Sequence, residues 1–305
     1  MQRVVVRKLP DGTVSQVYPF HVCLKGTESA VLCRDDRDYD AMIKAIAVCA
    51  HRKNVIVVIY TVVSNHCHVV VLAQSHADAS ACVEEVKRMY SMWFSRKYRE
   101  KGFLRRVASS AIYLDSDWYV RNALAYVPRN ALDNCCNVDE YKWSGYSAMF
   151  REGQDPQGWP VSAMTRREKE IVMHTCMDLR SVKWKLDEGG SLIPHTFCDH
   201  GYLEQAFGNS QAFFLKTIGS VNPVELGTKL VDMPRQRVSD AELFKAAEDL
   251  CGIWFGCGMA DISLERKMRL LPYIYRTRRT TVPQLARVFA LKREVVDDAV
   301  RRLMV

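Results

Sequence analysis

Ser64-Asn65-His66-Cys67-His68-Val69-Val70-Val71 joins a turn signal to the start of an apolar strand. Residues 54–63, directly upstream, are apolar and rich in β-branched side chains, so the two segments predict a β-hairpin. Alternate residues of a strand share a face. His66 and His68 would therefore present two imidazoles to one divalent ion, with Cys67 pointing into the core. A histidine pair alone is more often structural than metal-binding.

The order of elements around this hairpin predicts a ferredoxin-like fold. Strands are expected at 15–24, 55–63, 66–73 and 107–114, and helices at 39–51, 78–100 and 117–127. Four antiparallel strands with helices on one face satisfy this β-α-β-β-α-β-α order. We assign this α+β domain to residues 1–150.

Further motifs accompany the histidines in a fixed order: Tyr18-Pro19-Phe20-His21-Val22, Asp35-Asp36-Arg37-Asp38-Tyr39, Tyr90-Ser91-Met92-Trp93-Phe94, Tyr126-Val127-Pro128-Arg129-Asn130 and Trp143-Ser144-Gly145-Tyr146. Together they resemble the HUH single-tyrosine nucleases and, among them, the REP-associated tyrosine transposases. The chain departs from that family's pattern in having Ser64 for a proline, and Cys67 between the histidines. Lys25-Gly26 stands where Arg-Gly often follows the first strand.

The resemblance implies cleavage and joining of single-stranded DNA through a covalent phosphotyrosine. It assigns Tyr126 as the nucleophile, with Tyr119 as the alternative. It also assigns His66, His68 and the side-chain oxygen of Asn130 as ligands of Mg²⁺ or Mn²⁺. Pro128 lies between the two helical positions and is expected to end or kink the helix.

Composition agrees with a globular protein that binds a polyanion. The chain has 305 residues, a formal net charge of +8 and no long apolar run, and its N-terminus lacks a signal-peptide pattern. A nucleotide phosphate loop is also missing from the sequence. Eleven scattered cysteines are typical of reduced cytosolic thiols. We expect a protein of the bacterial cytosol or nucleoid.

A basic segment begins at the end of the second long helix and continues beyond it. Arg96, Lys97, Arg105 and Arg106 are interleaved with aromatic residues, so they can hold phosphates while the rings stack on unpaired bases. A solvated charge run at a helix C-terminus is the alternative.

The remainder is expected to be all-α, with a linker and helical region of unknown role at 151–238 and a helical domain at 239–305. Thr165 to Glu168 and Ser239 to Glu242 form capping boxes. A helix is expected at 264–277, broken or kinked by Pro272.

Residues 281–303 resemble a helix-turn-helix, similar to the tail of longer REP-associated transposases and to the DNA-binding domain of the initiator DnaA. Arg278, Arg279, Lys292 and Arg293 would contact phosphates. Asp297 and Asp298 argue against a uniformly cationic face. A three-helix packing module without DNA contact is the alternative.

Three functions remain open from the sequence. The first is a metal-dependent single-strand DNA endonuclease and strand transferase, acting at hairpin-forming repeats as a monomer or homodimer, with duplex DNA held by the tail. The second is a catalytically inactive regulator that binds DNA through the helix-turn-helix. The third is an RNA-binding ferredoxin-like domain, which leaves the histidine pair unexplained.

Overall fold

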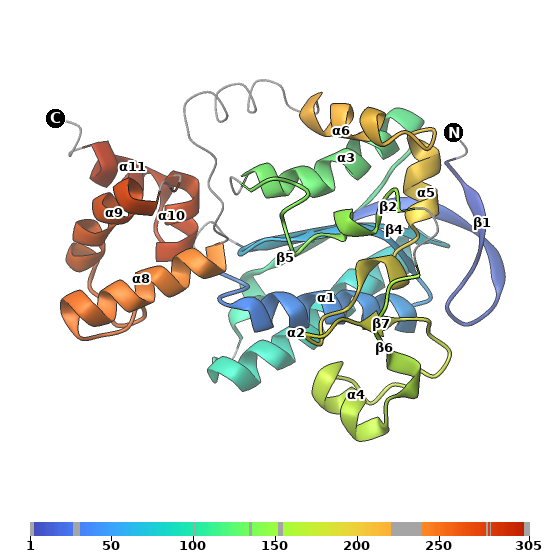
Figure 1. Ribbon diagram of the computed structural model, residues 1–305, viewed down its shortest axis with the longest axis horizontal. Helices are drawn as coiled ribbons and strands as arrows, with labels where there is room; N and C mark the ends of the chain where they lie inside the picture. The colour runs from blue at the N-terminus through green and yellow to red at the C-terminus, as the bar shows by residue number, and fades with distance from the viewer. Residues whose placement is uncertain are drawn as a thin grey trace.

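The computed structural model consists of a mixed α/β body and a group of C-terminal helices (Figure 1). It describes residues 3–26, 31–100, 102–133, 136–151, 155–220, 240–278, 280 and 282–301. No helix in these ranges is both long enough and apolar enough to cross a bilayer. The ten cysteines within these ranges carry free thiols.

The body is built on an antiparallel sheet with β2 at its centre. One edge of β2 pairs with β4, which pairs in turn with β3; β5 also pairs with β2, and the N-terminal β1 pairs with the first residues of β2. The predicted four antiparallel strands are present, and β1 is an addition that the sequence pattern did not reveal. The strands are β1 (Val5–Lys8), β2 (Val14–Lys25), β3 (Ile56–Val62), β4 (His66–Ala73) and β5 (Ala108–Tyr113).

Helices cover both faces of this sheet, whereas the sequence led us to expect them on one. The helices α1 (Asp36–Arg52) and α2 (His76–Tyr98) lie on one side, and α3 (Asp117–Asp133) lies on the other with α6 (Gln211–Ser220) (Figure 1). The reason is that β4 is apolar on both faces. Val69 and Val71 are buried on the side of α2, while Val70 and Leu72 are buried on the opposite side.

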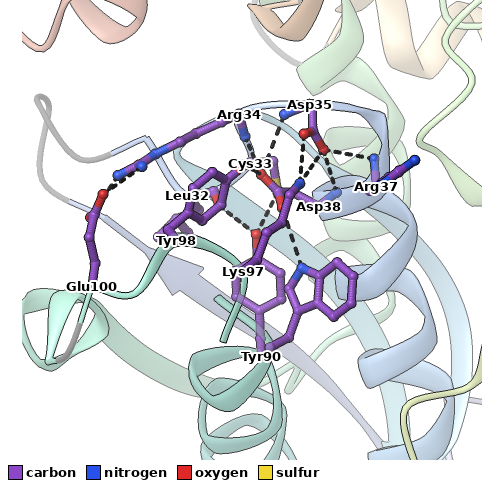
Figure 2. A network of polar contacts seen from close by, with 11 residues as sticks. Leu32, Cys33, Arg34, Asp35, Arg37, Asp38, Tyr90, Lys97, Tyr98 and Glu100 are labelled. Atoms are coloured by element: carbon purple, nitrogen blue, oxygen red, sulfur yellow. Dashed lines mark hydrogen bonds and ion pairs between the residues drawn. The ribbon is translucent and has the colours of Figure 1, made fainter. Parts of the chain in front are cut away.

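The start of α1 is tied to the end of α2 by a buried polar network (Figure 2). Asp38 is fully buried, and its carboxylate accepts hydrogen bonds from the ammonium of Lys97 at 2.7 Å and the hydroxyl of Tyr98 at 2.6 Å. Asp35 caps α1 and also binds Lys97. This network fixes the segment that runs from residue 31 into α1. Leu32 and Cys33 of this segment are hydrogen-bonded to Ser64 in the turn of the histidine hairpin.

Residues 155–220 pack onto the body. Thr165 and Glu168 form the predicted capping box. The expectation of an all-helical region is wrong here, because β6 pairs with β7. Leu203, Phe207 and Phe214 belong to the same hydrophobic core as the sheet. The elements are η2 (Gly145–Ala148), β6 (Trp159–Pro160), η3 (Val161–Ala163), α4 (Arg166–Val172), β7 (Lys185–Leu186), η4 (Pro194–Thr196) and α5 (His200–Ala206).

Four C-terminal helices enclose a second hydrophobic core, which we call the C-terminal unit (residues 240–301). Leu271, Leu285 and Val296 are buried in it. Helix α9 continues through Pro272, and Ser239 of the second capping box lies outside the described residues. The helices are α8 (Asp240–Phe255), α9 (Leu264–Arg278), α10 (Val282–Phe289) and α11 (Arg293–Arg301).

Candidate active site

The two histidines of the hairpin lie on the face of the sheet that α3 covers. His66 and His68 are the first and third residues of β4, and their ring centroids are 4.8 Å apart. Cys67 points the other way and is buried against α1 and α2, as the alternation predicted. His68 is only 8% exposed, whereas His66 is partly buried.

A third histidine, which the sequence analysis did not select, completes the cluster. His21 lies on β2, where the register pairs Cys23 with His68 and His21 with Val70. His21 is therefore diagonal to His68 on the same face. Its Nε2 lies 2.9 Å from Nδ1 of His68, and the two rings stack with centroids 5.0 Å apart. The sequence motif already placed His21 in the strand before α1. Its contact with His68 could not be predicted, because it depends on the register between β2 and β4.

Tyr126 lies against the histidine cluster. Its ring centroid is 5.2 Å from that of His68 and 6.2 Å from that of His21, nearly perpendicular to both. Tyr126 belongs to α3, which continues through Pro128 to Asp133 instead of ending near residue 127. The alternative nucleophile, Tyr119, lies about two turns earlier in α3. Its side chain is partly buried and packs against the core.

Asn130 reaches the site from the next turn of α3. Its Nδ2 donates to the backbone oxygens of Tyr126 at 2.8 Å and Val127 at 3.2 Å. These bonds identify the other amide atom as the oxygen, because a carbonyl oxygen can only accept. Asn130 Oδ1 lies 3.2 Å from Nε2 of His66, and the residue is 2% exposed.

The imidazoles of the site are neutral at physiological pH. Burial lowers the pKa of His66 to about 4 and that of His21 to about 4, and it holds the pKa of His68 well below its usual range. Neutral imidazole is the form that binds metal ions. The contact with His21 occupies Nδ1 of His68, which leaves Nε2 of His68 for a ligand.

The surroundings of His66 fit a cation. Its Nδ1 lies 2.8 Å from Oδ1 of Asn65, and its Nε2 faces Oδ1 of Asn130. The bonds made by Nδ2 of Asn130 fix its oxygen toward the ring, so Nε2 of His66 either donates to this oxygen or binds a cation together with it. A deprotonated Nε2 and Oδ1 are close enough to serve as two ligands of one cation, and amide oxygens are ligands that Mg²⁺ and Mn²⁺ accept.

This donor set is unusual in containing no carboxylate or thiolate. Across the described parts of the chain, no group of three or more His, Cys, Asp or Glu side chains is arranged to hold a metal ion. The expected ligands are two imidazoles and one amide oxygen.

The basic residues expected to contact DNA differ in their surroundings. Arg96 is exposed on α2, whereas Lys97 is bound by the carboxylates of Asp35 and Asp38 (Figure 2). Lys97 therefore has its charge balanced within the protein. Lys292 and Arg293 are exposed where α11 begins. The side chains of Arg105, Arg106 and Arg278, and the whole of Arg279, lie outside the described residues.

Comparison with known proteins supports a DNA-processing enzyme of the transposase class. Residues 14–110 match the family described as "Transposase IS200 like". The matched segment runs from the start of β2 into β5 and contains His21, His66 and His68. Tyr126 and Asn130 lie beyond it. No curated protein and no solved structure matches this chain.

Proposed function

We propose that this protein is a metal-dependent single-strand DNA endonuclease and strand transferase of the HUH single-tyrosine type, with Tyr126 as its nucleophile. The observation that carries the proposal is the position of Tyr126. Its ring lies 5.2 Å from that of His68, on the sheet face that also bears His66, whose Nε2 faces Asn130 of α3. The residues proposed as nucleophile and as ligands, although remote in the sequence, therefore lie close together, which supports the proposal.

In the proposed reaction, the phenol oxygen of Tyr126 attacks the phosphorus of a phosphodiester. The bond from this oxygen to phosphorus forms and the bond from phosphorus to the 3′ oxygen breaks. The phenol proton leaves to water, and the 3′ oxygen takes a proton to become a hydroxyl. Attack of a 3′-OH on the phosphotyrosine reverses these steps, so joining needs no nucleotide cofactor.

The chain's own residues would prepare this reaction. His66, His68 and Asn130 would hold the cation, which supplies positive charge at the scissile phosphate when bound. His21 would keep the His68 ring oriented, because a ligand imidazole is fixed by the partner of its other nitrogen. Loss of the cation should slow cleavage roughly 10²–10³-fold or more.

The substrate proposed from the family resemblance is single-stranded DNA beside hairpin-forming repeats, as in the REP-associated transposases. A monomer and a homodimer are both compatible with this proposal. Arg96 of the basic segment is exposed at the end of α2, where it could contact a phosphate. A DNA substrate would place the protein at the bacterial nucleoid.

A denaturing gel tests the enzyme directly. Full-length protein is incubated with labelled single-stranded hairpin DNA and Mn²⁺, and the adduct is mapped by mass spectrometry. We expect a covalent band carrying DNA on Tyr126, absent with Tyr126→Phe or excess EDTA and present with the matched variant Tyr119→Phe. A band that survives Tyr126→Phe would refute the assignment of the nucleophile, and full activity in EDTA would refute the metal.

We also propose that α10 and α11 form a helix-turn-helix that binds duplex DNA. Ala290 between them has a φ of 53°, a left-handed conformation that suits a tight turn. Phe289 and Val296 are buried between the helices, and Lys292 and Arg293 are exposed at the start of α11. This arrangement also supports the second function, an inactive regulator that binds DNA through these helices.

Salt-dependent binding to duplex DNA tests this proposal. Replacing Lys292 or Arg293 with Ala should weaken binding and reduce the salt slope by about 1 for each lost phosphate contact. Lys245→Ala removes the same charge from an exposed position on α8 and serves as the control. Equal binding by all three variants would contradict a role for α11.

A further inference from the structure

The turn that precedes His66 is in direct contact with the C-terminal unit. The hydroxyl of Ser64 donates a hydrogen bond to Oδ2 of Asp240, the first residue of α8. The two residues are 1% and 3% exposed. They are 176 positions apart and belong to parts of the chain with separate hydrophobic cores.

Asp240 is held in place by α10. The Nε of Arg287 lies 2.7 Å from Oδ2 of Asp240, and its Nη2 lies 3.2 Å from Oδ1. A buried carboxylate is tolerated when a cation and hydrogen bonds compensate its lost hydration. The two-point contact with the planar guanidinium also fixes the direction of the carboxylate. Oδ2 is thereby presented to Ser64.

The backbone of the turn is fixed by hydrogen bonds to the segments that precede it. The carbonyl of Ser64 accepts N–H groups from Leu32 at 2.6 Å and Cys33 at 2.8 Å, and the carbonyl of Asn65 accepts the N–H of Gly26 at 2.9 Å. The hydroxyl of Tyr90 donates to the carbonyl of Leu32 at 2.5 Å (Figure 2). Hydrogen bonds thus hold the turn to the neighbouring segment, and the hydroxyl of Ser64 links the turn to α8.

The same turn leads straight into the candidate active site. Asn65 Oδ1 contacts Nδ1 of His66, whose Nε2 faces Asn130. Because Ser64, Asn65 and His66 are consecutive, a shift of the turn would change the direction of the His66 ring. Arg287 and Asp240 are also close enough to His66 to influence its pKa. Burial lowers this pKa most; among the weaker effects, the charge of Arg287 lowers it and that of Asp240 raises it.

We propose that Asp240, held by Arg287, is a positioning residue for the candidate active site, and that it fixes His66 through Ser64. The consequence for catalysis rests on the proposed function, whereas the structural link does not. Since Arg287 belongs to the first helix of the proposed helix-turn-helix, the seating of that unit and the geometry of His66 would be coupled. The function of the C-terminal unit would then include completion of the nuclease site.

Hydrogen exchange measured by NMR on the full chain tests the link. The amides of Gly26, Leu32 and Cys33 report on the turn, and the imidazole signal of His66 reports on the site. Ser64→Ala should accelerate exchange of these amides about 10-fold, the amount expected for one lost hydrogen bond, and should shift the His66 signal.

Variants at Asp240 separate positioning from general stability. Asp240→Ala should cause the same changes as Ser64→Ala, and larger ones. Asp240→Asn keeps an acceptor for the Ser64 hydroxyl, so its His66 signal should stay at the wild-type position. Asp249→Ala, at an exposed position of the same helix, is the matched control and should change neither readout. Wild-type exchange and an unshifted His66 signal in Ser64→Ala would overturn the proposal, even if Asp240→Ala unfolds the protein.

The catalytic consequence is read from covalent adduct formation at saturating Mn²⁺. Ser64→Ala should slow it about 10-fold, at the lower end of the range for outer-shell partners of metal ligands. An unchanged adduct rate despite faster exchange would overturn the positioning role. If the wild-type protein forms no adduct, the proposed function fails, while the exchange and His66 signals still decide whether Asp240 fixes the turn.

Discussion

The side-chain oxygen of Asn130 lies 3.2 Å from Nε2 of His66, although 64 positions separate the two residues in the chain. The amide cannot rotate freely, because its Nδ2 is bonded to two backbone oxygens of its own helix. An oxygen lone pair is therefore held toward a buried, neutral imidazole. The ring nitrogen and the amide oxygen can therefore act together as ligands of one cation.

Replacement of Asn130 should weaken metal binding. Asn130→Ala removes the oxygen. We expect a loss of Mn²⁺ affinity of about 10–100-fold, the range typical of mutations around a metal site. Asn130→Asp restores a ligand oxygen but cannot donate to the carbonyls of Tyr126 and Val127, so it should bind Mn²⁺ while lowering stability. Titration calorimetry and urea unfolding measure the two effects. Equal Mn²⁺ affinity in Asn130→Ala and wild type would exclude Asn130 as a ligand.

Removal of His21 should affect the site without removing a ligand. His21→Ala deletes the partner of Nδ1 of His68, so the His68 ring loses its fixed orientation. We expect weaker Mn²⁺ binding by roughly 10-fold and a slower adduct rate that excess Mn²⁺ partly restores. His68→Ala should not be restored by Mn²⁺. Identical behaviour of the two variants would make His21 a ligand instead.

The stability of the metal-free protein should fall with pH below about 6.5. Burial lowers the pKa of His66 and of His21 to about 4, so the unfolded chain binds more protons between pH 6.5 and 4. The stability is fully present above 6.5 and is lost as the pH falls through about 4, by about 3 kcal/mol for each imidazole.

Urea unfolding in EDTA across this range measures the pH effect, and His66→Gln should make the curve shallower. A free energy of unfolding that is as high at pH 4 as at pH 7 would show that the buried imidazoles do not control stability.

Lys97 and Arg96 should separate folding from DNA binding. Lys97→Met leaves the fully buried Asp38 without its cation, and we expect a loss of about 3–5 kcal/mol in the free energy of unfolding. Arg96→Ala, at the adjacent exposed position, should change stability by less than about 0.5 kcal/mol and weaken binding to single-stranded DNA. The reverse pattern, with Lys97→Met stable but deficient in DNA binding, would assign the phosphate contact to Lys97.

Much of the fold follows from local pattern. The apolar, β-branched run from His66 places β4 at its observed bounds, and the alternation of side chains along a strand separates Cys67 from the histidines. The capping box at Thr165 places the start of α4. These features depend on neighbouring residues alone, so a sequence pattern is sufficient to predict them.

Other elements were mispredicted because packing outweighs local preference. Pro128 suggested the end of a helix, yet α3 continues because Val127 and Ala131, on either side, are completely buried against the sheet. The second covered face of the sheet was missed for a related reason. A run that is buried on both sides does not show which elements will cover it.

The amino-acid sequence by itself determined where β2, β3, β4 and β5 lie and that His66 and His68 share a face, because side chains alternate along any strand. Only the tertiary structure decided that His21, Tyr126 and Asn130 meet these histidines, and that Asp240 reaches the turn before them. Those contacts depend on strand register and on the docking of distant helices. Both are set by the burial of apolar surface across the whole molecule, which no local pattern encodes.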